Sequence, residues 1–292
     1  MTAGADRRHV LAGLAFVGLG ACERERDRRL SAAMRALQIG QVQHGGRQVF
    51  AWRGGERFNY CSTFKLFLAA CVIERAQREQ VRLDRAVPVL ASDILPHSPA
   101  AAPAVGGTLT VVELAQAAVE RSDNAAANLL IREIGGLDTL RAWYRAMGDE
   151  VTSIDRLEPE LNVRDGDKDT TTPNQTIQNL RWIDETYRPF TAFAAHRPLW
   201  DWLIDSPTGR GRIRAGVPDG WTVAHKTGTG LTGQTNDIGY AYAATETPVR
   251  IAVYYDAPAD LPLERREAVV AEASRRALSA LGHEAPGAGA PA

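Results

Sequence analysis

The sequence predicts an α/β (α+β) fold, with an antiparallel sheet formed from both chain termini, flanking helices and an inserted all-helical domain. Two observations support this. Short strand-like runs separated by turn residues lie near both ends of the chain, and the middle carries apolar residues at helical spacing. We therefore expect an α/β domain made of 30–60 and 206–283, interrupted by a helical domain over 61–205.

The first elements are a hairpin and a buried helix. Residues 37–43 and 48–52 alternate as strands do, and His44-Gly45-Gly46 supplies the turn between them. From Ser62 to Gln80 apolar residues recur at helical spacing. In the first part of this segment they occupy nearly every side of the expected helix, which is typical of a buried helix. Ser62 is expected in the first turn of that helix.

The remaining elements follow from capping residues, glycines and periodicity. The segment 156–172 has no sustained period and contains Pro159, Gly166 and several aspartates, so it is expected to be a compact functional loop. The expected helices cover 110–120, 125–134, 137–147, 173–187, 190–204 and 263–281, the expected C-terminal strands cover 221–227, 237–243 and 249–255, and the tail 284–292 is expected to be disordered.

Composition favours a globular protein with a small-molecule partner. The chain has 292 residues, 45% of them hydrophobic, which is enough to bury a core. Its formal charge of −1 gives no reason to expect nucleic acid or an anionic membrane surface as a partner. Cysteines and histidines are not spaced as metal ligands, so we expect neither a metal nor another cofactor.

The N-terminus has the pattern of an export signal over residues 1–22. Arg7 and Arg8 precede an apolar run, 10–19, that is too short to span a bilayer. The arginine pair resembles a twin-arginine signal, and Leu-Gly-Ala-Cys22 resembles the lipobox of bacterial lipoproteins. We expect an exported protein of the periplasm or cell envelope; anchoring through a lipidated Cys22 stays open.

The two remaining cysteines are expected to be free thiols. Cys61 and Cys71 lie ten positions apart on one expected helix. That separation corresponds to about 15 Å along the axis, too far for a disulfide.

Ser62 and Lys65 form a Ser-x-x-Lys pair that suits nucleophilic catalysis. Residues three apart share a helix face, which places an amine near the hydroxyl as a proton acceptor. Backbone N–H groups at the helix start can also stabilise an oxyanion at the serine. Taken alone, the pair also fits a solvent-facing lysine.

Two further motifs follow in the chain. Ser122-Asp123-Asn124 lies between two expected helices, where it fits an ordinary helix cap when read alone. Lys226-Thr227-Gly228 closes an expected strand and fits a strand end with a turn glycine. Chance is a poor explanation for the presence of all three motifs in one chain.

The set resembles class A β-lactamases and penicillin-binding proteins, whose motifs it shares over about residues 35–281. The segment Arg156-Leu-Glu-Pro-Glu-Leu-Asn162 is similar to the loop that separates class A β-lactamases from penicillin-binding proteins. The resemblance implies a β-lactamase/transpeptidase-like fold, a cofactor-free monomer, and hydrolysis of β-lactam antibiotics that confers antibiotic resistance.

The resemblance also implies residue roles. Ser62 would form the acyl-enzyme, Glu158 would activate the water for its deacylation, and Ser122 would protonate the departing ring nitrogen. Lys65 directly, or Glu158 through water, would serve as base for acylation, and both alternatives remain open. The implied substrate-binding residues are Asn124, Asn162, Lys226, Thr227, Gly228, Thr229, Arg212 and His97.

Within that set the implied roles differ. Asn162 would position the water, Asn124 would bind the substrate side-chain carbonyl, and Lys226 with Thr227 would bind its carboxylate. The N–H of Thr229 would join that of Ser62 in an oxyanion hole. Arg212 would reinforce the anion site, although it also fits a surface arginine. His97 would stack beside the substrate entrance or be an ordinary loop histidine.

The resemblance further implies supports for the loop that carries Glu158. It implies a cis Glu158–Pro159 bond, an Asn128 brace and an Arg156–Asp169 ion pair.

The sequence departs from the family at three places. The loop between Asn162 and Asp169 is shorter than in common members, which suggests a wider pocket and broader cephalosporin acceptance as a hypothesis. Cys61 precedes the nucleophile as in several carbapenem-hydrolysing members, but Gly230 occupies the place of their partner cysteine. His225, before Lys226, is unusual and receives no assigned role.

Three alternatives differ in chemistry. A penicillin-binding protein or DD-carboxypeptidase would trap the acyl-enzyme, and the segment around Glu158 argues against it. A serine-lysine amidohydrolase of the glutaminase kind would not be expected to carry Lys226-Thr227-Gly228. A non-catalytic lipoprotein that binds cell-wall fragments is disfavoured because every catalytic position is filled.

Overall fold

The computed structural model describes residues 41–44, 47–51, 53–186, 197–243 and 248–283. The expected export signal, residues 37–40 of the first expected strand, and the tail 284–292 lie outside these ranges.

The two ends of the chain form one five-stranded antiparallel sheet in the order β2-β1-β9-β8-β7. Strand β1 pairs with β9 through Gln41 and Ala252, so the N-terminal hairpin lies beside the last strand. This confirms the predicted mixed fold. The strands are β1 (Gln41–His44), β2 (Arg47–Ala51), β7 (Thr222–Thr229), β8 (Thr235–Tyr242) and β9 (Val249–Val253).

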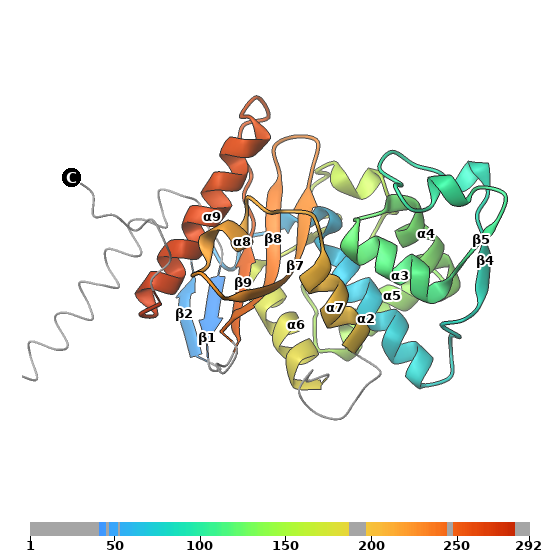
Figure 1. Ribbon diagram of the computed structural model, residues 1–292, viewed down its shortest axis with the longest axis horizontal. Coiled ribbons are helices and arrows are strands. Elements are labelled where there is room, and N and C mark those ends of the chain that lie inside the picture. The colour runs from blue at the N-terminus through green and yellow to red at the C-terminus, as the bar shows by residue number, and fades with distance from the viewer. Residues whose placement is uncertain (1–40, 45–46, 52, 187–196, 244–247, 284–292) are drawn as a thin grey trace, which may run out of the picture.

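Helices cover both faces of the sheet (Figure 1). On one face lie α8 and α9, and on the other lies the larger helical part of the chain, with α2 at its centre. The helices are α2 (Phe64–Gln77), α3 (Val111–Glu120), α4 (Asn124–Glu133), α5 (Leu137–Ala146), α6 (Pro173–Thr186), α7 (Arg197–Asp205), α8 (Ile213–Gly216) and α9 (Leu263–Ala280).

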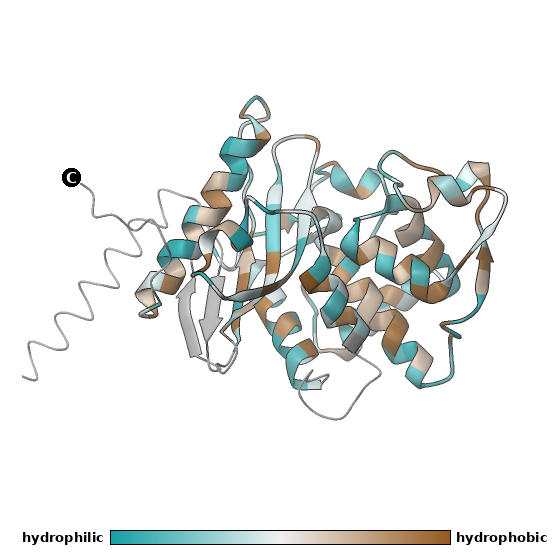
Figure 2. Cartoon of the chain, in the orientation of Figure 1, coloured by the Kyte–Doolittle hydropathy of each residue, from teal (hydrophilic) through white to brown (hydrophobic). Residues whose placement is uncertain are grey.

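Alternation along the strands separates two hydrophobic cores. Ala224 and Ile238 face the helical part, whereas Val223 and Ile251 pack with α8 and α9. Helix α9 carries hydrophilic and hydrophobic residues along its length (Figure 2), as expected of a helix with one face on a sheet. The first eleven residues of α2, by contrast, are buried on every side.

The expected helices are present, but the prediction for the nucleophile was wrong in detail. Ser62 lies in a 3₁₀ turn, Cys61–Thr63, and α2 begins only at Phe64. Cys61 has a φ of +48°, a left-handed conformation that a helix start does not contain. The expected helix over 190–204 begins at Arg197 within the described residues, and residues 190–196 lie outside them.

Two short antiparallel pairings were not predicted, because strands of two or three residues leave no periodicity. Strand β3 (Phe58–Asn59) pairs with β6 (Thr170–Thr171), and β4 (Ala86–Pro88) pairs with β5 (Thr108–Thr110). The β3–β6 pairing matters for the site, because it joins the segment before Ser62 to the end of the loop 156–172.

Among the described helices, none has the length and apolar character that crossing a membrane requires.

Candidate active site

Ser62 and Lys65 are brought together as the sequence predicted. Lys65 Nζ donates to Ser62 Oγ at 3.1 Å, and the lysine is completely buried while Ser62 is 9% exposed. Lys65 also donates to the carbonyl of Ser122 at 2.8 Å and to Asn124 Oδ1 at 2.5 Å. Burial lowers the pKa of Lys65, and the neighbouring Glu158 carboxylate opposes that shift. The solvent-facing alternative for Lys65 is therefore wrong.

The Ser122-Asp123-Asn124 motif is both a helix cap and part of the site. Asp123 caps α4 by accepting from the N–H of Ala126. Ser122, at a φ of +57°, directs its hydroxyl toward Lys226 and its carbonyl toward Lys65. The amide of Asn124 bridges Lys65 and the carbonyl of Pro96.

Lys226 completes this cluster from the edge strand β7. Its Nζ donates to Ser122 Oγ at 3.0 Å and to the Thr227 carbonyl at 2.9 Å. Burial lowers the pKa of Lys226 well below its usual range, the Lys65 ammonium lowers it further, and the Asp237 carboxylate opposes both. Ser122 thus contacts both buried amines, Lys226 through its hydroxyl and Lys65 through its carbonyl.

Gly228 lets strand β7 approach the nucleophile. A Cβ at Gly228 would lie 2.7 Å from the carbonyl oxygen of Tyr60 and 3.2 Å from Cys61 Cβ. Asn236, on β8, donates to the carbonyls of Asn59 and Tyr60 and holds the same turn. Any side chain at position 228 would therefore collide with the turn that carries Ser62.

Arg212 is buried, so the alternative interpretation of this residue as a surface arginine is wrong. Its guanidinium donates to Thr229 Oγ1 at 2.7 Å and to the Gly228 carbonyl at 3.0 Å. Its Nε pairs with Glu267 Oε1 at 2.9 Å. Arg212 therefore holds the end of β7, where Thr227 and Thr229 lie, and Thr227 Oγ1 is itself 3.0 Å from Thr208 Oγ1.

Glu158 reaches the nucleophile from the loop 156–172. Its Oε1 lies 2.9 Å from Lys65 Nζ and 3.4 Å from Ser62 Oγ, and its Oε2 accepts from Asn162 Nδ2. Asn128, on α4, donates to the Glu158 carbonyl at 2.8 Å and accepts from its N–H at 3.0 Å. The Glu158–Pro159 bond is cis. The expected Asn128 brace and cis bond are both present.

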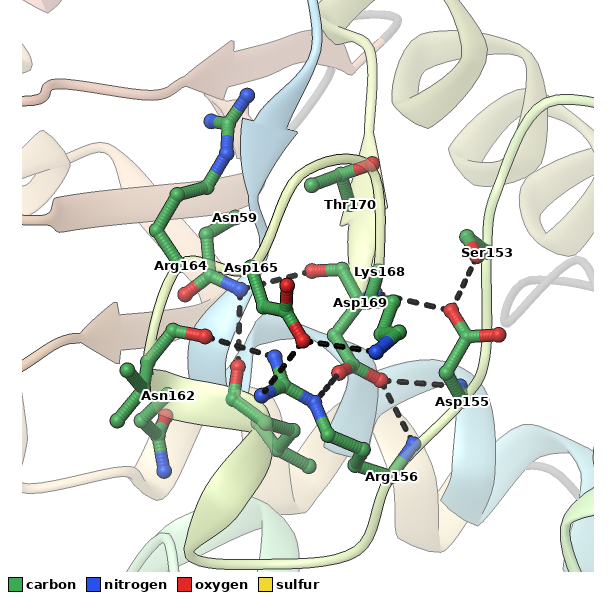
Figure 3. Close-up of polar contacts among 12 residues, drawn as sticks. Asn59, Ser153, Asp155, Arg156, Asn162, Arg164, Asp165, Lys168, Asp169 and Thr170 are labelled. Carbon is green, nitrogen blue, oxygen red and sulfur yellow. Dashed lines mark hydrogen bonds and ion pairs between the residues drawn. The ribbon is translucent and has the colours of Figure 1, made fainter.

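An ion pair closes the neck of this loop (Figure 3). Arg156 Nε pairs with the buried carboxylate of Asp169, which also accepts the N–H groups of Asp155 and Arg156 and the Tyr60 hydroxyl. The Asn59 amide donates to the Asp169 carbonyl. The expected ion pair is confirmed, and it is part of a buried network.

The shortened part of the loop closes on itself at the surface. Asp165 and Lys168 form an isolated β-bridge and an ion pair of 2.8 Å, with both side chains more than half exposed. Arg156 also lies 3.9 Å from the Asp165 carboxylate. Lys168, unlike the other two lysines, therefore lies away from the nucleophile.

His97 lies beside the Ser122-Asp123-Asn124 motif, where its carbonyl accepts from the N–H of Asn124 at 3.0 Å. His97 is exposed, has a φ of +62°, and its Nε2 is 3.0 Å from the Arg121 carbonyl. Cys61 and Cys71 are buried free thiols, as predicted. Burial raises the pKa of Cys61 well above its usual range and that of Cys71 to about 12.

Several residues around the site had no signal in the sequence. They are common residue types without a recognisable motif: Asp237, Asn236, Glu267 and Thr208. Only the packing of strands and helices brings them close to β7 and the segments around it. His225 was noticed but left without a role, and it pairs with Asp237. Within the described residues, no group of three or more histidine, cysteine or acidic side chains has the arrangement of a metal site.

The fold and this site define a class A serine β-lactamase architecture, and comparison with known proteins agrees. The family described as "Beta-lactamase enzyme family" matches residues 23–281. This chain therefore belongs to the β-lactamase enzyme family.

Individual relatives are similar over most of their length. The "Carbapenem-hydrolyzing beta-lactamase KPC" of Klebsiella oxytoca is 40% identical over 241 residues, 82% of this chain and 81% of that protein. "Beta-lactamase Toho-1" of Escherichia coli is 36% identical over 241 residues, 82% of each chain. A solved β-lactamase from Xanthomonas campestris has a TM-score of 0.82 at 33% identity, covering 88% of this chain and 99% of its own.

Proposed function

We propose that this protein hydrolyses the amide bond of β-lactam antibiotics through an acyl-enzyme on Ser62, which a water activated by Glu158 then releases, and that it thereby confers antibiotic resistance. The observation that carries the proposal is the position of the Glu158 carboxylate, in contact with both Ser62 Oγ and Lys65 Nζ. A serine ester is stable unless a base activates water against it, and Glu158 supplies that base beside the ester carbon.

In acylation, Ser62 Oγ attacks the lactam carbonyl and gives its proton to Lys65 or, through a water, to Glu158. Both bases are within reach, Lys65 at 3.1 Å and Glu158 at 3.4 Å. The lowered pKa of Lys65 favours its use as a proton carrier. The N–H groups of Ser62 and Thr229 would stabilise the tetrahedral oxyanion.

Collapse of that intermediate breaks the carbon–nitrogen bond. The Ser122 hydroxyl, which accepts a hydrogen bond from Lys226, would pass its proton to the ring nitrogen. The proton taken from Ser62 would then pass on to Ser122, so that the acylation base and Lys226 enter deacylation in their original protonation states. In deacylation, Glu158 takes a proton from water while the water oxygen attacks the ester carbonyl, and Ser62 leaves and regains its proton. Asn162, bonded to Glu158 Oε2, would orient that water.

The substrate carboxylate would bind at the end of β7. Lys226, Thr227 and Thr229 lie there, and Arg212 adds a buried positive charge behind Thr229.

We propose penicillins and cephalosporins as substrates. We also propose that the shortened loop allows bulky cephalosporins to bind. Turnover of bulky oxyimino-cephalosporins that is far slower than turnover of benzylpenicillin would refute this second proposal. Carbapenem hydrolysis is not proposed, because Gly230 occupies the position at which several carbapenem-hydrolysing members carry the partner of the cysteine that matches Cys61.

We also propose that the protein is exported to the periplasm or cell envelope by its first 22 residues and acts as a monomer. Supporting observations are the arginine pair and the short apolar run. Fractionation of cells that express the full chain, beside a Cys22→Ser variant, tests export and lipid anchoring: loss of membrane association only in the variant would indicate lipidation.

The decisive experiment follows hydrolysis of benzylpenicillin and a chromogenic cephalosporin past one equivalent per enzyme, using the chain without residues 1–22. We expect sustained turnover, its loss in Ser62→Ala, and a one-equivalent burst with a trapped acyl-enzyme, visible by mass, in Glu158→Gln. Glu160→Gln, an exposed neighbouring acid, is the matched control and should turn over normally.

Either of two results would contradict the proposal. A burst that stops at one equivalent in the wild type would indicate a penicillin-binding protein. Sustained turnover in Glu158→Gln would remove the role given to Glu158.

A further inference from the structure

Asn59 joins the turn that carries Ser62 to the loop that carries Glu158. It is the last residue of β3, three positions before the nucleophile, and it is completely buried. Its Nδ2 donates to the carbonyl of Leu161 at 2.8 Å and to that of Asp169 at 2.9 Å (Figure 3). These two carbonyls lie on either side of the shortened part of the loop, so a single amide group holds both.

The hydrogen bonds fix which way this amide faces. Carbonyl oxygens only accept, so the NH2 group must lie between them and the amide oxygen must face the other way. There Oδ1 accepts from the thiol of Cys61 at 3.1 Å. The backbone carbonyl of Asn59 accepts in turn from Asn236 Nδ2, on β8, at 3.0 Å. Both polar atoms of the Asn59 side chain therefore have partners, and the sheet holds the residue in place.

The contact with Leu161 sets the orientation of the next residue, Asn162. The Leu161 carbonyl and the Asn162 N–H belong to one planar peptide group. Asn59 holds the carbonyl side of this group, and the N–H side donates to the Pro159 carbonyl at 3.1 Å. The Asn162 side chain in turn donates to the Glu158 carboxylate. A change at Asn59 would therefore reach both proposed deacylation groups through this peptide.

The two carbonyls depend on Asn59 to different degrees. The Asp169 carbonyl also accepts from the N–H of Tyr60 at 3.2 Å, so it keeps a partner without the amide. The Leu161 carbonyl belongs to a buried residue, and among the described residues no donor other than Asn59 reaches it. Loss of the amide would thus leave the neck of the loop closed but release the arm around Leu161.

We infer that Asn59 is a positioning residue for deacylation, because its amide fixes the loop arm around Glu158 relative to the turn that carries Ser62. Lys65 has further contacts, with the Ser122-Asp123-Asn124 motif, that do not involve this arm. Asn59 therefore matters much more for deacylation than for acylation through Lys65. The inference rests on the proposed function, since it assumes that Glu158 activates the water.

Acylation and deacylation can be measured separately in Asn59→Leu, whose side chain has a similar shape but no donor. Single-turnover reactions of the purified protein with benzylpenicillin, quenched and followed by the mass of the acyl-enzyme, give both rate constants. The deacylation rate constant should fall at least about tenfold, because catalysis depends on placement within about 1 Å, and the acylation rate constant should change less than about twofold. Since slower deacylation lowers kcat and KM together, kcat/KM should stay nearly unchanged.

Two comparisons separate the amide donors from their surroundings. Cys61→Ala removes the thiol contact and leaves both donors in place, so its deacylation rate constant should stay within about twofold of the wild type. Asn59→Ala leaves a cavity that Asn59→Leu does not, so the same selective loss in both variants would assign the effect to the missing donors. An equal loss of both rate constants in Asn59→Leu, or slow deacylation in Cys61→Ala, would overturn the inference.

A second measurement needs no Asn59 variant that folds. In the wild type both side-chain N–H protons of Asn59 are buried and hydrogen-bonded. Nuclear magnetic resonance should show them exchanging with solvent at least about a hundredfold more slowly than those of Asn174, which is exposed. Exchange as fast as at Asn174 would show that the two hydrogen bonds are absent in solution and would overturn the inference. Absence of turnover in the wild type with these protons protected would count against the proposed function, not against the contacts of Asn59.

Discussion

Lys65 Nζ lies 2.9 Å from Glu158 Oε1, and neither side chain has any exposed surface. This contact joins the start of α2 to the loop 156–172, two segments that are far apart in the chain. Because the loop carries the proposed deacylation base, whatever holds the loop in place also sets the geometry of the reaction.

Removing the brace on Glu158 should slow turnover. Asn128→Ala loses both hydrogen bonds to the Glu158 backbone, and a displaced base is costly because catalysis depends on placement within about 1 Å. We expect kcat for benzylpenicillin to fall at least about tenfold, and the free energy of unfolding to fall by about 1–3 kcal/mol. Steady-state kinetics and urea denaturation measure the two effects. Asn174→Ala, at an exposed position, serves as control; an unchanged kcat in Asn128→Ala would refute the brace.

Asp169→Asn should destabilise the protein strongly. The Asp169 carboxylate is completely buried and accepts from Arg156, Asp155 and Tyr60, so loss of its charge leaves buried donors poorly matched. Breaking a buried pair costs about 3–5 kcal/mol, whereas an exposed pair contributes about 0–1 kcal/mol. Asp165→Asn, which breaks the exposed pair with Lys168 and the 3.9 Å contact with Arg156, should therefore be nearly neutral. Equal losses in the two variants would show that the buried network is not what closes the loop.

Gly209→Ala should weaken substrate binding more than it slows chemistry. The added Cβ would lie 2.4 Å from Thr227 Cγ2, so the threonine must move away from its place at the proposed carboxylate site. We expect KM to rise about tenfold with a smaller change in kcat. Gly220→Ala has the same left-handed backbone, with φ of +79° against +63°, but meets nothing within 4 Å. It therefore controls for backbone strain, and an equal rise of KM in both variants would contradict the steric explanation.

The two thiols should be inert in the native protein. Thiolate is the reactive form, and burial raises the pKa of Cys71 to about 12 and that of Cys61 well above its usual range. A thiol reagent at pH 8 should modify neither cysteine in the folded chain without residues 1–22, and both in guanidinium chloride. Glu160→Cys, exposed on the loop, should react at once.

The same thiol shifts determine a dependence of stability on pH. A pKa raised by folding contributes stability below the unfolded value, near pH 9, and loses it as the pH rises toward the folded value. The free energy of unfolding should therefore decline between pH 9 and pH 12, and decline less in Cys71→Ala. An equal decline in both proteins would count against the shift at Cys71.

Sequence reasoning anticipated most of the fold because its signals are local. The periodicity of α2, the capping residues Thr110 and Glu113 of α3, and the turn residues around β7 and β8 each act through neighbours in the chain. The same reasoning missed β3 and β6, which have two residues each and exist only because they pair with one another. It also placed Ser62 inside the helix, since the left-handed Cys61 leaves no pattern in the sequence.

The sequence by itself determined the chemistry available: a serine with a lysine three residues on, a second serine and lysine in two further motifs, and an acid in a loop that resembles that of class A β-lactamases. Only the tertiary structure decided which groups meet, bringing Lys65 to the carbonyl of Ser122 across 57 positions and Lys226 to its hydroxyl across 104. It also buried Arg212 and paired His225 with Asp237. The physical reason is that residue type and local spacing act between chain neighbours, whereas burial and long-range contact depend on how the sheet, the helices and the loop pack together.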